Sequence, residues 1–164
     1  MSTSVDYSVD YIEMKIPAEP EYVGIVRLTL SGVASRMGYT YDDIEDLKIA
    51  VSEACTNAVQ HAYNDENKGE VSVRFGVFED RLEVIVADQG DSFDFDQKQQ
   101  DLGPYTPSHT VDQLSEGGLG LYLMETLMDE VKVQSNSGVT VAMTKYLNGE
   151  RVDHGTTIKN YETN

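Results

Sequence analysis

The stretch YDDIEDLKIAVSEACTNAVQHAY, residues 41–63, decides the fold, because one helical period runs through its whole length. Apolar residues recur in it at intervals of three and four, the spacing of an amphipathic helix. The apolar stripe consists of Ile44, Leu47, Val51, Ala54, Ala58 and Ala62. Thr40 followed by Asp43 resembles a capping box and marks the helix start. The pattern predicts a long helix over Tyr41–Tyr63 whose apolar stripe packs on a sheet.

A second stripe on the same helix is polar. Glu53, Asn57 and His61 follow one another at intervals of four, so they lie roughly one above the other, away from the apolar stripe. A polar stripe alone is typical of a helix face in water. It indicates a functional site only if another part of the molecule faces it.

Periodic patterns also predict the other elements. We expect strands over Tyr11–Pro17, Glu70–Phe78, Arg81–Ala87, Glu130–Ser135 and Val139–Tyr146, and helices over Glu19–Met37 and Gly120–Met128. Gly38 ends the first helix as a C′ residue, and Gln89–Glu116 is predicted to be one long loop. This order predicts an α+β, two-layer sandwich with a mostly antiparallel sheet and helices on one face. We expect a single domain over 1–164, with its core at about 10–147 and a polar tail at 148–164.

The charge balance excludes two classes of partner. The 164 residues include 12 Lys and Arg against 29 Asp and Glu, a net charge of −17. This balance offers no basic patch for nucleic acid and disfavours an anionic membrane surface. The longest stretch without a charged residue, Val133–Thr144, is too short to span a bilayer, and the amino terminus lacks the pattern of a secretory signal. Since the one cysteine, Cys55, is expected to be a small buried residue, we expect a cytoplasmic protein.

Two glycine-containing segments carry further signals. Asp88-Gln89-Gly90 follows a predicted strand, which places a carboxylate at the strand end and accessible backbone at Gly90. Gly117-Gly118-Leu119-Gly120 leads into a helix that continues with Leu121, where free N–H groups and the helix dipole favour a phosphate. Alone, the first segment is more typical of a turn, and the second is equally typical of tight packing.

Together, the segments EACTNAVQHAY at 53–63, DQGDSF at 88–93 and EGGLGLYLMETLMDEV at 116–131 resemble the ATP site of the GHKL family, which includes gyrase, Hsp90, histidine kinases and MutL. The resemblance spans about Tyr11–Tyr146. It implies ATP and Mg²⁺ as cofactors. Motifs of P-loop NTPases, eukaryotic-type kinases and zinc sites are absent from the sequence.

The resemblance implies roles for individual residues. Asn57 would give its amide oxygen to Mg²⁺, and Glu53 would accept or orient the proton of a serine hydroxyl. Asp88 would accept a hydrogen bond from the adenine amino group, and Gly90 would let the base sit close. The other implied nucleotide-binding residues are His61, Gly117, Gly118, Leu119, Gly120 and Leu121. A lone histidine such as His61 is also typical of a structural residue.

Within this family, the chain resembles the free-standing anti-sigma kinases of Gram-positive stress regulation. The resemblance implies a protein-serine kinase that inhibits a sigma-B-type sigma factor by binding it. It also implies that ATP is used to phosphorylate a serine on an anti-anti-sigma antagonist protein, which inactivates that protein. A homodimer without direct contact to nucleic acid or membrane is implied as well. The strand around Ile12–Ile16 and the first helix are candidates for dimerisation, because an exposed edge strand invites pairing.

Departures from the family pattern leave two alternatives open. Ser92 stands where the first box often has a second glycine, and Glu116 stands where the related sporulation kinase is expected to have arginine. No basic residue lies between Lys98 and Lys132 to offset transition-state charge. One alternative is therefore an ATP-sensing anti-sigma binding module without phosphotransfer. Another is the catalytic domain of a histidine kinase, although the few residues before Tyr11 leave no room for a phosphoacceptor helix.

The acidic charge coincides with the nucleotide motifs. Eleven acids and one base lie between Leu82 and Val131. Acids repel the phosphates of free ATP. Glycine N–H groups, the helix dipole and Mg²⁺ are therefore expected to hold the phosphates, so that ATP affinity depends strongly on Mg²⁺.

Overall fold

The computed structural model describes residues 9–62, 69–88, 103–104, 120–134 and 138–147. Within these ranges the strands are β1 (Asp10–Pro17), β2 (Glu70–Val77), β3 (Arg81–Ala87), β4 (Gly103–Pro104), β5 (Glu130–Gln134) and β6 (Thr140–Tyr146). The α-helices are α1 (Val23–Met37), α2 (Tyr41–Ala62) and a helix at residues 120–127.

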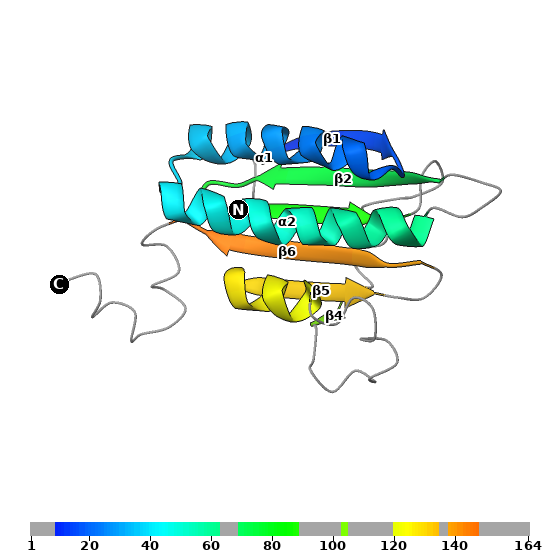
Figure 1. Cartoon of the computed structure of the whole chain (residues 1–164). Helices are drawn as coiled ribbons and strands as arrows, with labels where there is room; N and C mark the ends of the chain where they lie inside the picture. The colour runs from blue at the N-terminus through cyan, green and yellow to red at the C-terminus, as the bar shows by residue number, and fades with distance from the viewer. Residues whose placement is uncertain (1–8, 63–68, 89–102, 105–119, 135–137, 148–164) are drawn as a thin grey trace, which may run out of the picture.

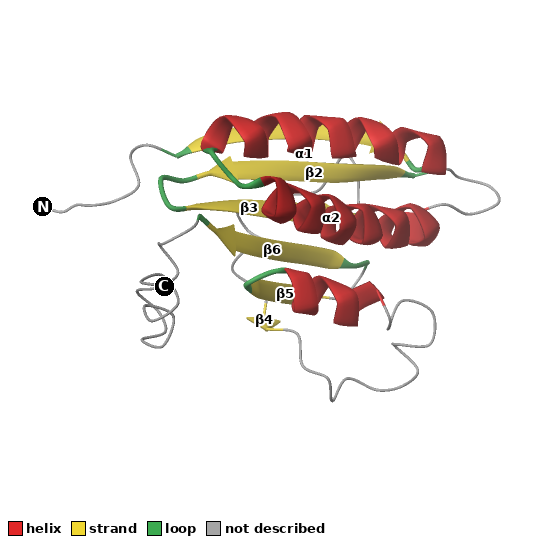
Figure 2. Cartoon of the chain, turned by 60° about the vertical axis from the view of Figure 1, so that its left-hand side comes forward, coloured by secondary structure: helices red, strands yellow, loops and turns green. Residues whose placement is uncertain are grey.

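All six strands form one antiparallel sheet with the order β1-β2-β3-β6-β5-β4. α1, α2 and the helix at 120–127 lie over the same face of this sheet (Figure 1, Figure 2). The predicted α+β two-layer sandwich is therefore confirmed. Since β3 and β6 are neighbours, the end of β3 and the start of β6 lie side by side near the centre of the sheet.

The predicted strands agree with the structure to within one residue at each described end. The hairpin between β2 and β3 has the predicted two-residue turn at Glu79 and Asp80, because the N–H of Phe78 donates to the carbonyl of Arg81 at 3.0 Å. β1 lies at the sheet edge, as expected, and pairs with β2. The register places Ile12 opposite Phe75.

The prediction of one unbroken loop over Gln89–Glu116 is wrong at one place. Gly103 and Pro104 form β4, which pairs with Val133 and Lys132 of β5. Two residues are too few to show a period of two, and proline is tolerated at a sheet edge. The remainder of that predicted loop and the predicted tail at 148–164 lie outside the described residues.

The predicted start of the first helix at Glu19 is also wrong. Pro20–Tyr22 form a 3₁₀ turn, in which the N–H of Tyr22 donates to the carbonyl of Glu19 at 3.0 Å, and the α-helix begins only at Val23. Proline fits the first position of either kind of turn, so the apolar spacing does not separate them. The predicted helix end is confirmed, because Gly38 has φ 98° and its N–H donates to Ser35.

The central helix α2 forms as predicted. The hydroxyl oxygen of Thr40 accepts a hydrogen bond from the N–H of Asp43 at 3.1 Å, which caps the first turn. Its apolar stripe faces the sheet: Leu47, Val51, Ala54 and Ala58 are buried, and Ile44 and Ala62 pack against the same core. Cys55 is also buried, as expected. None of the helices in the described ranges is long and apolar enough to cross a membrane.

Candidate functional site

Asp88 follows the last residue of β3 and is held by the chain just before β6. The N–H of Val139 donates to both carboxylate oxygens of Asp88, at 3.0 Å to Oδ1 and 3.1 Å to Oδ2. In return, the N–H of Asp88 donates to the carbonyl of Val139 at 3.2 Å. The side chain of Asp88 is 4% exposed. Its carboxylate is therefore a fixed and nearly desolvated acceptor beside the C-terminal end of α2.

Burial raises the pKa of Asp88 above its usual range, although hydrogen bonding to Val139 and the charge of His61 act in the opposite direction. A carboxylate has about four lone-pair sites, so one bifurcated donor leaves acceptor capacity unused. A further N–H donor from a bound molecule would stabilise this carboxylate. The position suits recognition of an amino group.

His61, from the last turn of α2, reaches the same carboxylate. Its Nδ1 atom lies 3.4 Å from Oδ2 of Asp88, and its side chain is 59% exposed. The sequence predicts His61 as a residue lining the site but does not predict that it pairs with Asp88. The structure thus brings together two predicted site residues that are 27 positions apart in the sequence.

At the other end of the polar stripe, Glu53 and Asn57 meet Gly120, the first described residue of the helix at 120–127. A Cβ atom added to Gly120 would lie 2.9 Å from Oε1 of Glu53 and 3.2 Å from Nδ2 of Asn57. Both side chains are half-buried, and Gly120 itself is buried. The stripe is therefore not simply a solvated helix face, because its first two members face Gly120 of another helix.

The site is thus a line along α2. Eight residues separate Glu53 from His61, which corresponds to about 12 Å along the helix axis. Asp88 lies at the His61 end, and Gly120 lies at the end formed by Glu53 and Asn57. Such a line has a desolvated acceptor at one end, and the polar side chains of Glu53 and Asn57 beside Gly120 at the other.

The donors at the Gly120 end fit a hard cation. The amide of Asn57 offers an oxygen ligand one helical turn from the carboxylate of Glu53, and Mg²⁺ prefers oxygen ligands and usually takes only one or two from protein side chains. The glycine-rich helix start that the sequence predicts at this place would favour anionic groups. A phosphate and its metal ion could therefore lie side by side there.

The other predicted site residues either pack against the core or lie outside the described residues. Leu121 is half-buried and packs against the hydrophobic core, so its side chain has a structural contact. Gly90, Gly117, Gly118 and Leu119 lie outside the described residues.

Two residues near these elements are missed by the sequence reasoning. Val139 holds Asp88 through its backbone, which leaves no signal in side-chain identity. Lys145 is buried and donates to the carbonyl of Leu127, the last residue of the helix at 120–127. A signal for Lys145 was present, because it continues the inward alternation of Val141 and Met143 in β6.

Comparisons with known proteins identify the family of this chain. Residues 16–145 match the model of the histidine kinase-like ATPase domain family. Serine-protein kinase RsbW of Bacillus subtilis (strain 168) is 89% identical over 157 residues, which cover 96% of this chain and 98% of that protein. Serine-protein kinase RsbW of Oceanobacillus iheyensis is 58% identical and covers 88% of this chain and 91% of that protein.

A solved structure shows the same fold. It contains the RsbU and RsbW domains of Rv1364c from Mycobacterium tuberculosis, and it matches with a TM-score of 0.59 at 22% identity. The match covers 84% of this chain and 32% of that longer chain.

These matches confirm the resemblance to the GHKL family and the expected class of enzyme, a serine-protein kinase. They do not favour the two alternatives, since relatives at 80% identity and above share one kinase name. The chain therefore belongs to the histidine kinase-like ATPase family and, within it, to the RsbW serine-protein kinases.

Proposed function

We propose that this kinase is an anti-sigma factor: it binds and inhibits a sigma-B-type sigma factor, and it uses Mg²⁺-ATP to phosphorylate a serine on an anti-anti-sigma antagonist. The observation that carries the proposal is the meeting of Glu53 and Asn57 with Gly120 in a chain 89% identical to a named serine-protein kinase. One domain over 1–164, with its core at 10–147, would perform both tasks in the cytoplasm.

The Gly120 end of the site would perform the transfer. Glu53 would accept the proton as the serine oxygen bonds to the γ-phosphorus of ATP and the bond from phosphorus to the ADP oxygen breaks. Asn57 would hold Mg²⁺ through its amide oxygen. The bound metal ion would supply positive charge against the phosphates. N–H groups at Gly117–Leu121 would contact the phosphates.

The Asp88 end would select the base. The carboxylate would accept a hydrogen bond from the adenine amino group, and His61 would line the site beside it. Gly90 would allow the ring to lie close to the backbone. Guanine has a carbonyl where adenine has the amino group, so it would offer Asp88 no hydrogen-bond donor at that place. Guanine nucleotides would therefore bind more weakly than adenine nucleotides.

Phosphotransfer tests the proposal directly. Purified protein, an antagonist protein and γ-labelled ATP should yield label on an antagonist serine, and Glu53→Gln should reduce the rate by about 100-fold or more because the proton acceptor is lost. Glu45→Gln is the matched control, since Glu45 lies on the same helix and contacts Lys48 at 3.1 Å. Equal labelling by wild type and Glu53→Gln would refute the role of Glu53.

Sigma binding is tested separately. A sigma-B-type sigma factor should bind the wild type and Glu53→Gln equally, because Glu53 belongs to the nucleotide site. Sigma binding that responds to ATP, with no label on any antagonist, would support the ATP-sensing module instead. No binding of the sigma factor would refute the anti-sigma proposal.

We also propose a homodimer formed through β1 and α1. β1 is the edge strand of the sheet, and its Tyr11 and Ile12 side chains are 51% and 40% exposed. Light scattering should give twice the monomer mass for wild type, and Ile12→Lys should shift the protein towards the monomer. Ile49→Lys, at an exposed apolar position on α2, is the control.

A further inference from the structure

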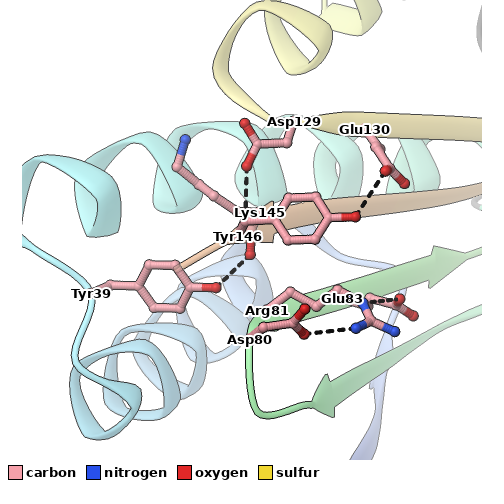
Figure 3. A network of polar contacts seen from close by, with 8 residues as sticks. All are labelled: Tyr39, Asp80, Arg81, Glu83, Asp129, Glu130, Lys145 and Tyr146. Atoms are coloured by element: carbon pink, nitrogen blue, oxygen red, sulfur yellow. Dashed lines mark hydrogen bonds and ion pairs between the residues drawn. The ribbon is translucent and has the colours of Figure 1, made fainter. Parts of the chain in front are cut away.

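A buried lysine lies at the end of the molecule opposite Asp88. Lys145 is the sixth residue of β6, and its side chain is 8% exposed. Figure 3 shows this side chain among the residues that join β6 to the neighbouring elements. Lysine is rarely buried without partners, because its ammonium group loses hydration there.

The partners of the Lys145 ammonium come from both helices of the site. Its Nζ atom donates to the carbonyl of Leu127 at 2.8 Å, and it lies 4.0 Å from Oδ1 of Asp43. Leu127 is the last residue of the helix at 120–127, and Asp43 lies in the first turn of α2. A cation at a helix C-terminus satisfies a carbonyl that has no partner within the helix and interacts favourably with its dipole.

The backbone that carries Lys145 is itself held on both sides. The Tyr39 hydroxyl donates to the carbonyl of Lys145, and the N–H of Tyr146 donates to Oδ2 of Asp129 at 2.7 Å (Figure 3). The N–H of Asp129 donates to the carbonyl of Thr144 at 2.9 Å. The ammonium group therefore extends from a part of β6 that is tied both to the chain before α2 and to the chain after residue 127.

Both described ends of the helix at 120–127 are thus linked to α2. At one end, the Lys145 ammonium binds Leu127 and lies near Asp43. At the other end, Gly120 meets Glu53 and Asn57. Seven residues separate Leu127 from Gly120, which is about 10 Å along the helix axis, so a shift at Leu127 is carried to Gly120 by a short rigid element.

We propose that Lys145 is a positioning residue for phosphoryl transfer: by holding the C-terminus of the helix at 120–127, it sets the place of Gly120 against Glu53 and Asn57. The inference rests on the proposed nucleotide site. It concerns the phosphate end only, because Asp88 is held by Val139 and not by this helix.

The test separates the two ends of the nucleotide. Lys145→Met keeps an unbranched apolar chain but cannot hold the Leu127 carbonyl. It should weaken Mg²⁺-ATP binding and slow phosphotransfer by about 10- to 100-fold, since small misplacements of reacting groups cost that much. Binding of adenosine, measured by calorimetry or competition, should change less than about twofold because the Asp88 end is untouched. Lys145→Arg, which can still donate to Leu127, should recover most of the activity.

Arg81→Met is the matched control. Arg81 lies at the same end of the molecule and pairs with Asp80 at 2.7 Å and Glu83 at 3.0 Å, both within its own hairpin (Figure 3). It should lower thermal stability without changing the ratio of ATP affinity to adenosine affinity. If Lys145 had only a structural role, Lys145→Met and Arg81→Met would both leave the ratio of ATP affinity to adenosine affinity unchanged.

Two results would overturn the inference: unchanged ATP affinity and transfer rate in Lys145→Met, or equal losses for ATP and adenosine. If Lys145→Met does not fold, Lys145→Arg decides, and a transfer rate in Lys145→Arg as low as that of Asn57→Ala would contradict the role. Failure of the underlying site would show differently, as unchanged ATP binding in both Asn57→Ala and Asp88→Asn.

Discussion

The Nδ1 atom of His61 lies 3.4 Å from Oδ2 of Asp88, which joins the last turn of α2 to the end of β3. The same carboxylate accepts the N–H of Val139 from the chain before β6. Asp88 is thus held between a helix and a neighbouring strand at one end of the proposed site. Because this carboxylate is both buried and fixed, a substitution of Asp88 tests the proposed base-recognition end of the site directly.

Asp88→Asn should weaken ATP binding by about tenfold or more, since a hydrogen bond to a charged group is lost. The protein should not be destabilised at pH 7. Burial raises the pKa of Asp88, so its contribution to stability is fully present below its unfolded pKa of about 4 and is lost as pH rises through the folded value.

Calorimetry and thermal melts check both parts of this prediction. The melting temperature of Asp88→Asn should equal or exceed that of wild type at pH 7, and the gap should close as pH falls towards about 4. A lower melting temperature at pH 7 with unchanged ATP affinity would assign Asp88 a structural role only.

His61→Gln should move the pH profile of ATP binding. The charge of His61 lowers the pKa of Asp88, so its removal should raise that pKa further and make ATP affinity fall at a higher pH. The loss at pH 7 should stay below about tenfold because His61 is 59% exposed and screened by solvent. Dissociation constants for ATP should be measured between pH 5.5 and 8, with Gln60→Ala, a change at an exposed neighbouring residue, as the control. If the pH profile of His61→Gln is the same as that of wild type, the His61–Asp88 pair does not influence ATP binding.

Gly120→Ala should impair catalysis more than stability. The added Cβ would lie 2.9 Å from Oε1 of Glu53, and this flexible side chain can move away at little energetic cost. The moved carboxylate would no longer be placed for proton transfer, so the transfer rate should fall by about 100-fold.

Gly32→Ala is the control for that substitution. Gly32 lies inside α1, and an added Cβ there would meet nothing within 4 Å. The variant should gain about 0.5–1 kcal/mol of stability at full activity. Similar transfer rates in Gly120→Ala and wild type would contradict the close approach of Gly120 to Glu53.

Removal of Mg²⁺ should reduce ATP affinity strongly, because acids dominate the segment from Leu82 to Val131 and repel free phosphates. Titrations with ATP in Mg²⁺ and in EDTA give the ratio of dissociation constants. This ratio should shrink in Asn57→Ala, which lacks the proposed metal ligand, and should persist in Asp88→Asn. Equal affinity with and without the metal ion in wild type would refute the metal dependence.

Cys55 should be inert in the folded protein. It is fully buried, and burial raises the pKa of its thiol to about 12. A thiol reagent at pH 8 should label Cys55 in the native protein no faster than the protein unfolds, and should label the urea-unfolded protein rapidly. Fast labelling under native conditions would contradict this prediction and would show that the packing of α2 against the sheet opens frequently.

The parts of the fold that follow from local pattern could be predicted. α2 shows its apolar stripe, its Thr40 cap and its polar stripe in sequence because helical spacing places each residue on a known side. β4 and the 3₁₀ turn at Pro20–Tyr22 could not be predicted from the sequence, since two or three residues are too few to show a helical or strand period. Their conformations depend on neighbours that come from elsewhere in the chain.

The sequence by itself determined which residues compose the candidate site, because spacing along α2 aligns Glu53, Asn57 and His61, and Asp88 follows the end of a strand. Only the tertiary structure decided what these residues meet: Gly120 at one end, and Val139 and the His61–Asp88 pair at the other. It also placed the Lys145 ammonium at the carbonyl of Leu127. The physical reason is that periodicity reports the direction of a side chain from its own helix or strand. Its partner is set by the order of strands in the sheet, in which β3 and β6 become neighbours although 52 residues lie between Ala87 and Thr140.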